Sequence, residues 1–162
     1  MASETFVDFT VLLRAAPLVS ATSALWFSAD QYTFLNNFLR PEHRNEAESV
    51  VPSYFKTFFP GGLTRILFLY GVSISTGTAN FWARPNASWH WYAAGTAFAV
   101  AHFAFAPRII SVVQSLTENR HPKQGNRDLK KWLDIHVVRS ILADLPAWIC
   151  FVVATLTSLQ PL

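Results

Sequence analysis

Four long apolar segments constrain this chain more than any other feature of its sequence. They cover Phe9–Ser28, Leu63–Trp82, Trp91–Val113 and Val137–Leu159. Each approaches the ~20 residues that an α-helix needs to cross the hydrocarbon core of a bilayer. Charged residues make up only 14% of the 162 residues, against roughly 25% in soluble domains. The pattern predicts an all-α polytopic membrane protein, with a single integral membrane domain over residues 1–162 built as a four transmembrane helix bundle.

All four segments carry polar or ionisable side chains. The first contains Arg14, the second Arg65, the third His102 and the fourth Asp144. Ionisable groups are costly in hydrocarbon, so they normally face a bundle interior or a cavity and find partners there. We therefore expect helices that pack together and enclose their polar residues.

Lysine and arginine side chains are concentrated in two of the three loops. The loop between the first two segments carries Arg40, Arg44 and Lys56, and the loop before the fourth carries Arg120, Lys123, Arg127, Lys130 and Lys131. The remaining loop carries only Arg84, and the two terminal tails carry no lysine or arginine. The positive-inside rule then predicts that the two basic loops are cytosolic and that both termini are lumenal or outside, in an endomembrane (ER) or plasma membrane.

The loop between the first two segments is rich in aromatic residues. Tyr54, Phe55, Phe58 and Phe59 surround one lysine, a composition typical of an interfacial or re-entrant segment. A lid over a cavity and a simple interfacial anchor both remain open. Pro60-Gly61-Gly62 predicts a break before the second span.

Several classes of function are disfavoured by what the sequence contains. Its one cysteine, Cys150, allows no intramolecular disulfide, Cys-x-x-Cys pair or cysteine-based zinc site. No P-loop, glycine-rich dinucleotide fingerprint or nucleophile-elbow serine is visible. The net charge of +3 is too mild to indicate nucleic acid as a partner.

Polar residues from all four segments fall in the cytosolic half of the predicted bundle. They are Asp30, Arg65, Arg108, His136, Arg139 and Asp144, with Tyr70 a little more than one turn deeper than Arg65 and His102 near the midpoint of the third span. This distribution predicts one polar pocket that opens toward the cytosolic face or its leaflet. On the fourth helix, Trp132, His136 and Arg139 share a face at positions i, i+4 and i+7. Pro146 frees the carbonyl of Leu142, so we expect a kink beside the pocket.

Each of these residues also has a structural interpretation. Arginine near a helix end normally extends toward the headgroups. Asp144 is suited to an inter-helix ion pair, and His102 to a hydrogen bond with Ser or Thr in the core. On ideal helices His102 and His136 differ in depth by roughly 10–15 Å, which disfavours haem ligation by both. His102 and Asp144 allow a metal but do not form a ligand set, so none is indicated.

The start of the last helix carries a family resemblance. Four spans in a short chain, with Trp132 followed by His136 and Arg139, resemble the anthrone oxygenase-like family of small membrane proteins. That family often has Trp, then a polar residue such as Asn, then Arg at this spacing, and His136 stands where Asn is common. Pro107-Arg108 and Thr117-Glu118-Asn119 fall roughly where such proteins carry a Pro/Asn-rich stretch.

The resemblance implies a small membrane monooxygenase of polyketide tailoring, a branch of secondary metabolism. It would oxidise an anthrone-like aromatic with O2 as co-substrate and without a recognised cofactor. An anthrone that loses its benzylic proton becomes a carbanion able to react with O2, so the enzyme needs a base, cations beside the oxyanion and an apolar cavity. The expected catalytic residues are His136, His102 and Asp144, with either histidine as the base. The expected substrate-binding residues are Arg139, Arg65, Tyr70, Trp132, Asp30 and Arg108.

Two other classes of function fit the same pocket. A membrane cyclase or isomerase of a terpenoid or polyketide would use Asp144 or Asp30 as an acid and would need no O2. A non-enzymatic membrane subunit would use the buried charges to hold its helices together. In each case the expected surroundings are the lipid bilayer and, for an enzyme, a lipophilic small molecule; a homo-oligomer is left open.

Overall fold

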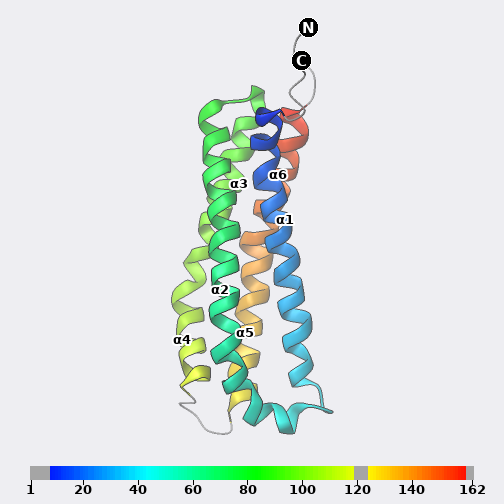
Figure 1. Cartoon of the computed structure of the whole chain (residues 1–162), viewed down its shortest axis with the longest axis vertical. Coiled ribbons are helices and arrows are strands. Elements are labelled where there is room, and N and C mark those ends of the chain that lie inside the picture. The colour runs from blue at the N-terminus through cyan, green and yellow to red at the C-terminus, as the bar shows by residue number, and fades with distance from the viewer. Residues whose placement is uncertain (1–7, 119–123, 160–162) are drawn as a thin grey trace.

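The computed structural model describes residues 8–118 and 124–159, and its regular elements within these ranges are all helices (Figure 1). Short 3-10 or π segments are labelled η. In chain order the elements are α1 (Phe9–Asn36), η1 (Asn37–Leu39), α2 (Arg44–Ala83), η2 (Asn86–Ser88), α3 (Trp89–Ala101), η3 (His102–Phe105), α4 (Ala106–Thr117), α5 (Gly125–Arg139), η4 (Ser140–Asp144) and α6 (Leu145–Ser158). Asn119, Arg120 and Lys123, on which part of the resemblance and of the loop-charge prediction rests, lie outside the described residues.

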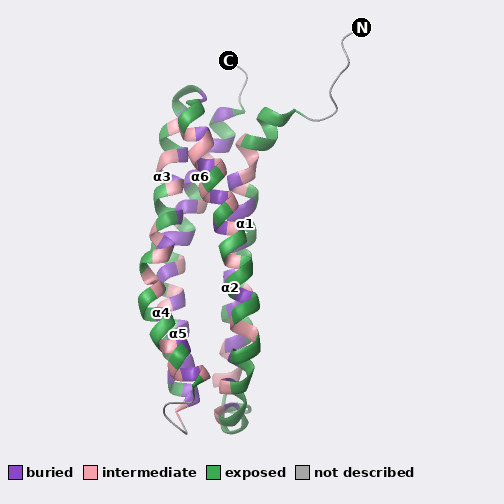
Figure 2. Ribbon diagram, turned by 60° about the vertical axis from the view of Figure 1, so that its left-hand side comes forward, coloured by how far each residue is buried: buried purple, intermediate pink, exposed green. Residues whose placement is uncertain are grey.

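These elements join into four rods that confirm the predicted all-α bundle. The rods Phe9–Leu39, Arg44–Ala83, Asn86–Thr117 and Gly125–Ser158 are each long and apolar enough to cross a membrane. α1 begins and α6 ends at the same end of the bundle (Figure 1). Large apolar side chains such as Phe68, Trp82 and Leu156 are exposed on the outside, where Figure 2 shows most of the exposed residues. Such a surface suits contact with lipid chains.

The second rod is twice as long as a bilayer requires. At 1.5 Å per residue the 40 residues of α2 extend about 60 Å, against the ~30 Å of a hydrocarbon core. The aromatic stretch expected in a loop therefore belongs to the same helix as the second span. The break predicted at Pro60-Gly61-Gly62 is wrong, because α2 continues through it.

Tertiary packing explains why this helix is not interrupted. Phe55 is fully buried and meets Trp132 edge-on, with ring centroids 5.7 Å apart. A Cβ at Gly62 would lie 3.3 Å from Nε2 of Gln31, so this glycine allows α1 and α2 to approach closely. Packing of this kind routinely overrides the local preferences of proline and glycine.

The interior consists of two apolar clusters, one toward each end of the bundle. The first cluster joins η1 and helices α1, α2, α4 and α5 around Phe55, Leu129 and Trp132. The second joins α1, α2, α3 and α6 around Tyr70, Tyr92 and Phe151. A polar layer lies between the two cores and consists mainly of His102, His136, Arg139 and Asp144, all buried. Other buried polar side chains, such as Asn80 and Asn126, lie nearer the ends of the bundle.

Two of the rods leave α-geometry at this polar level. The third rod passes through the 3-10 segment η3, which begins at His102, and the fourth passes through the π-helical segment η4, which ends at Asp144. Each segment is followed by a proline within the first two residues of the next helix. The irregularity expected near Pro146 is thus present as a π turn, a feature frequently found at functional sites.

Candidate functional site

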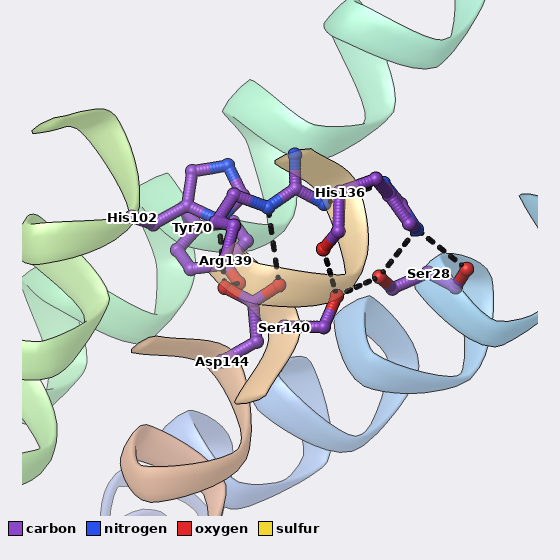
Figure 3. A network of polar contacts seen from close by, with 7 residues as sticks. All are labelled: Ser28, Tyr70, His102, His136, Arg139, Ser140 and Asp144. Atoms are coloured by element: carbon purple, nitrogen blue, oxygen red, sulfur yellow. Dashed lines mark hydrogen bonds and ion pairs between the residues drawn. The ribbon is translucent and has the colours of Figure 1, made fainter. Parts of the chain in front are cut away.

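The carboxylate of Asp144 is the centre of the polar layer. Its Oδ1 accepts hydrogen bonds from the Tyr70 hydroxyl at 2.6 Å and from Nδ1 of His102 at 2.8 Å. Its Oδ2 accepts from Nε of Arg139 at 3.3 Å. Asp144 is only 4% exposed, so a charged carboxylate is stable there because a cation and two further donors surround it (Figure 3).

Arg139 connects this carboxylate to His136. Its Nη2 lies 3.0 Å from Nδ1 of His136, and arginine can only donate, so Nδ1 must accept. The other ring nitrogen, Nε2, lies 2.9 Å from the Ser28 carbonyl, which can only accept. His136 is therefore assigned as the neutral tautomer that carries its proton on Nε2, and both nitrogens are engaged.

Two serines complete the network on the α1 side. The Ser140 hydroxyl donates to the His136 carbonyl at 2.8 Å, which leaves Ser28 to donate to Ser140 across 2.8 Å. The Ser28 oxygen also lies 3.0 Å from Nε2 of His136. The indole of Trp132 stacks on the His136 ring at 4.7 Å and 19°. His136 is thus fixed on every side.

His102 is held differently. Its Nδ1 faces Asp144, and its ring lies 4.0 Å from that of Tyr70, centroid to centroid. The second ring nitrogen, Nε2, turns away from the carboxylate (Figure 3) and has no hydrogen-bond partner within residues 8–118 and 124–159. Because an ionised Asp144 requires the proton on Nδ1, the neutral ring presents a lone pair at Nε2.

A cavity of about 160 Å³ adjoins this layer. Its walls are mainly apolar and include Phe58, Phe59, Ile66, Phe103, Phe105 and Ile109. Four polar side chains also line it: Gln31, His102, Trp132 and Arg139. Leu63 of α2 and Ile110 of α4 line the cavity and are about half exposed, so the cavity reaches the outer surface between these helices. A mostly apolar cavity with a few convergent polar groups is the usual form of a small-molecule site.

The structure brings most of the predicted site residues together. Tyr70, His102, Trp132, His136, Arg139 and Asp144 form one connected group. The Tyr70 hydroxyl donates to Asp144, and the expected role of Tyr70 in substrate binding stays a prediction. A π turn over Ser140–Asp144 separates Arg139 from Asp144, so the spacing of a regular α-helix does not describe how these residues meet.

Three predicted residues do not join this group. Arg65 is exposed, with its guanidinium 5.6 Å from the centre of the Phe27 ring, and Arg108 is exposed on α4. Asp30 is half-buried, and neither it nor the two arginines line the cavity. They project from other faces of their helices, and their expected roles in substrate binding stay predictions.

The network and the cavity also include three residues that the sequence did not single out: Ser28, Gln31 and Ser140. The buried face of α1 runs through Pro17, Ser20, Ala21, Ala24, Ser28, Gln31 and Leu35. This spacing of three and four residues is the helical signature of an inward face. It would have selected Gln31 over its neighbour Asp30. Among the described residues, no group of three or more His, Cys, Asp or Glu side chains is arranged to hold a metal.

Comparison with curated proteins finds relatives that match almost end to end. The chain is 30% identical over 162 residues to the epoxidase gkaX of Penicillium citrinum, which covers 91% of this chain and 95% of that protein. It is 29% identical over 158 residues to the probable epoxidase scpX of Mollisia scopiformis, at 91% and 96% coverage. It is 24% identical over 160 residues to the oxaleimides biosynthesis cluster protein N of Penicillium oxalicum, at 92% and 90% coverage.

No protein-family model and no solved structure matches the chain. The resemblance to the anthrone oxygenase-like family therefore stays a prediction.

Proposed function

This chain belongs to the family of the Penicillium citrinum epoxidase gkaX, and from that premise we propose that it is a membrane-embedded oxygenase of secondary metabolism that epoxidises a carbon–carbon double bond of a lipophilic metabolite. The names of its relatives support an oxidative tailoring role. The apolar cavity between α2 and α4 supports a lipophilic substrate that enters from the surrounding bilayer.

One observation carries the proposed chemistry. His102 is oriented by a buried carboxylate through Nδ1 while its free Nε2 belongs to a ring that lines the cavity. A carboxylate–histidine pair of this kind fixes the tautomer and stabilises the imidazolium that forms when the ring takes a proton. His102 is therefore the base in our proposal. His136 is the less suitable of the two because Arg139 and Ser28 engage both of its nitrogens.

The proposed reaction begins with proton transfer. Nε2 of His102 removes an acidic C–H proton beside the double bond, and the bonding pair remains on the substrate as a carbanion. The carbanion adds O2 to form a C–O–O⁻ group, which takes the proton back from His102 as a hydroperoxide. Its outer oxygen then transfers to the neighbouring double bond, leaving an epoxide and a hydroxyl group. Both oxygen atoms stay in the product, so no separate reductant is needed.

This proposal is tested by supplying membranes that contain the protein with lipophilic alkenes bearing an acidic C–H, under ¹⁶O2 and ¹⁸O2. We expect a product heavier by two oxygen atoms, both of them labelled by ¹⁸O2, in mass spectrometry. Replacing His102 with Gln should lower the rate about 10²–10⁴-fold, the usual contribution of a general base. His136→Gln should retain more activity, and His90→Gln, an exposed histidine outside the network, should match the unmodified protein.

Other outcomes would redirect the proposal. Conversion at an equal rate under argon would indicate the cyclase or isomerase, and full activity in His102→Gln would remove this residue as the base. The anthrone substrate implied by the family resemblance stays a prediction. The same assay with anthrone tests it, because there the hydroperoxide would lose water to give a quinone.

A further inference from the structure

We infer that the cavity recognises an enolisable ketone, a carbonyl group beside the carbon that His102 deprotonates, and that Trp132, Gln31 and Arg139 hold the enolate oxygen. This inference rests on the proposed function and defines its substrate class. It comes from hydrogen-bond donors that the protein buries at the cavity without giving them partners.

The indole N–H of Trp132 gives the clearest indication that a hydrogen-bond acceptor is missing from the cavity. Its side chain lines the cavity and is only 3% exposed, yet its Nε1–H has no hydrogen-bond partner among the described residues. Leaving such a buried donor unsatisfied carries a free-energy cost. Phenylalanine would fill much of the same space without that cost. A tryptophan here is explained if a ligand oxygen accepts from its indole.

Gln31 adds a second group of the same kind. It is 8% exposed and lines the same cavity, and its amide makes no hydrogen bond to any described residue. Gly62 leaves space for it, since a Cβ there would lie 3.3 Å from the Gln31 Nε2. The helix contact is therefore shaped to keep a polar amide at the cavity wall.

Arg139 provides the third donor and limits the charge of the ligand. Its Nε and Nη2 are used by Asp144 and His136, while Nη1 has no partner among the described residues. Because Asp144 already balances the arginine charge, the site carries no free positive charge that would call for a carboxylate or phosphate. Two neutral donors and an arginine whose charge is already balanced suit a carbonyl that is neutral when it binds and becomes negative as the proton leaves.

The chemistry of the base requires the same functional group. A neutral imidazole removes a C–H proton only if the resulting carbanion is delocalised, and an adjacent carbonyl moves that charge onto oxygen. In the step we infer, His102 Nε2 takes the α-proton, the C–H electron pair forms the C=C bond of the enolate, and the oxygen accepts hydrogen bonds from the three donors. Return of the proton from His102 restores the ketone, so no oxidant takes part.

The test uses 2-tetralone, a compact ketone with acidic α-protons, and tetralin, the hydrocarbon of the same shape. The full-length protein in nanodiscs is incubated under argon in D2O, and NMR follows deuterium exchange at the α-carbon. We expect exchange well above the protein-free rate. Trp132→Phe and Gln31→Leu should each slow it by about tenfold or more, as loss of an oxyanion donor does. 2-Tetralone should also bind more tightly than tetralin.

Matched controls separate recognition from folding. Trp26→Phe and Gln114→Leu change exposed residues of the same types outside the cavity and should leave exchange unchanged. If Trp132→Phe does not fold, Gln31→Met provides the same test. Equal affinity for ketone and hydrocarbon, or exchange at the original rate in both cavity variants, overturns the inference. The exchange assay is run without oxygen, so it does not depend on the proposed oxygenation. Normal exchange under argon together with no oxygenation in air would count against the proposed function alone.

Discussion

Asp144 is the most connected residue of the polar layer, because side chains from three rods converge on its carboxylate. Tyr70 comes from α2, His102 from η3 and Arg139 from α5. All four residues are less than 10% exposed. A buried pair of charges adds little net stability, but removing one member leaves the other buried without compensation. Loss of either member of the pair is therefore expected to destabilise the fold, and in the proposed reaction it also disturbs the base His102.

Replacing Asp144 with Asn should destabilise the protein and abolish oxidation. Loss of the carboxylate leaves Arg139 buried and unpaired, a cost of about 3–5 kcal/mol. Tyr70→Phe should cost only about 0.5–1.5 kcal/mol because it removes a single hydrogen bond. Thermal unfolding in detergent, read beside turnover, checks both values. Equal melting temperatures for the two variants would contradict this account.

The double variant Arg139→Met with Asp144→Leu separates stability from catalysis. Apolar residues that replace both members of a buried pair are often neutral or stabilising. We expect thermal stability near that of the unmodified protein and no turnover, because His102 loses the group that orients it. Retained turnover in this variant would assign the buried charges a purely structural role.

At the level of the elements, the π turn of η4 allows the side chains of Arg139 and Asp144 to meet. On a regular α-helix, residues five apart point about 140° away from each other. In the structure these two meet at 3.3 Å, because η4 winds more widely between them. Pro146 supports this geometry, since it cannot donate the hydrogen bond that an α-turn would require. The helix thus departs from regularity in order to place its carboxylate.

Packing in the apolar cluster around Phe151 depends on the close approach of α3 and α6 at Gly95. A Cβ there would lie 2.7 Å from the Phe151 ring, which is fully buried between α3 and α2. Gly95→Ala should lower the free energy of unfolding by about 1–3 kcal/mol, as overpacking does. Gly71→Ala, where nothing lies within 4 Å, should instead be neutral or stabilising by up to ~1 kcal/mol. Thermal unfolding of the two alanine variants makes the comparison, and equal losses would argue against tight packing at Gly95.

At the scale of the whole molecule, the bundle is longer than a membrane is thick. The end formed by α4, α5 and the first half of α2 carries solvent-compatible pairs such as Lys130–Asp134, both exposed. The opposite end carries Arg84 and the short η2 turn. The distribution of basic residues predicts that the first of these ends faces the cytosol.

Labelling of single cysteines tests this orientation. In a Cys150→Ala background, Ser53→Cys places a thiol at the predicted cytosolic end and Asn86→Cys places one at the other; both positions are exposed. In sealed microsomes, whose outer face is cytosolic, a membrane-impermeant maleimide should label Ser53→Cys directly. Asn86→Cys should react only after permeabilisation. The opposite pattern would reverse the predicted topology.

The sequence by itself was sufficient for the four-helix membrane architecture and for the identity of most polar residues in the layer. Bilayer-length apolar segments and buried charges are local properties, since the hydrocarbon imposes a fixed length and a high cost on each charge. For this reason His102, His136, Arg139 and Asp144 could be selected without knowledge of the fold.

Only the tertiary structure decided how those residues are used. Helical periodicity assumes regular helices, so it could not predict the contact that the π turn makes possible between Arg139 and Asp144. It also gave no reason to choose between the two histidines. The position of a residue along a helix does not determine which side of the helix its side chain faces. For that reason Arg65 and Arg108 were expected in a pocket that they do not line. The roles of His102 and Gln31 depend on which atoms remain without partners, and partners come from other helices.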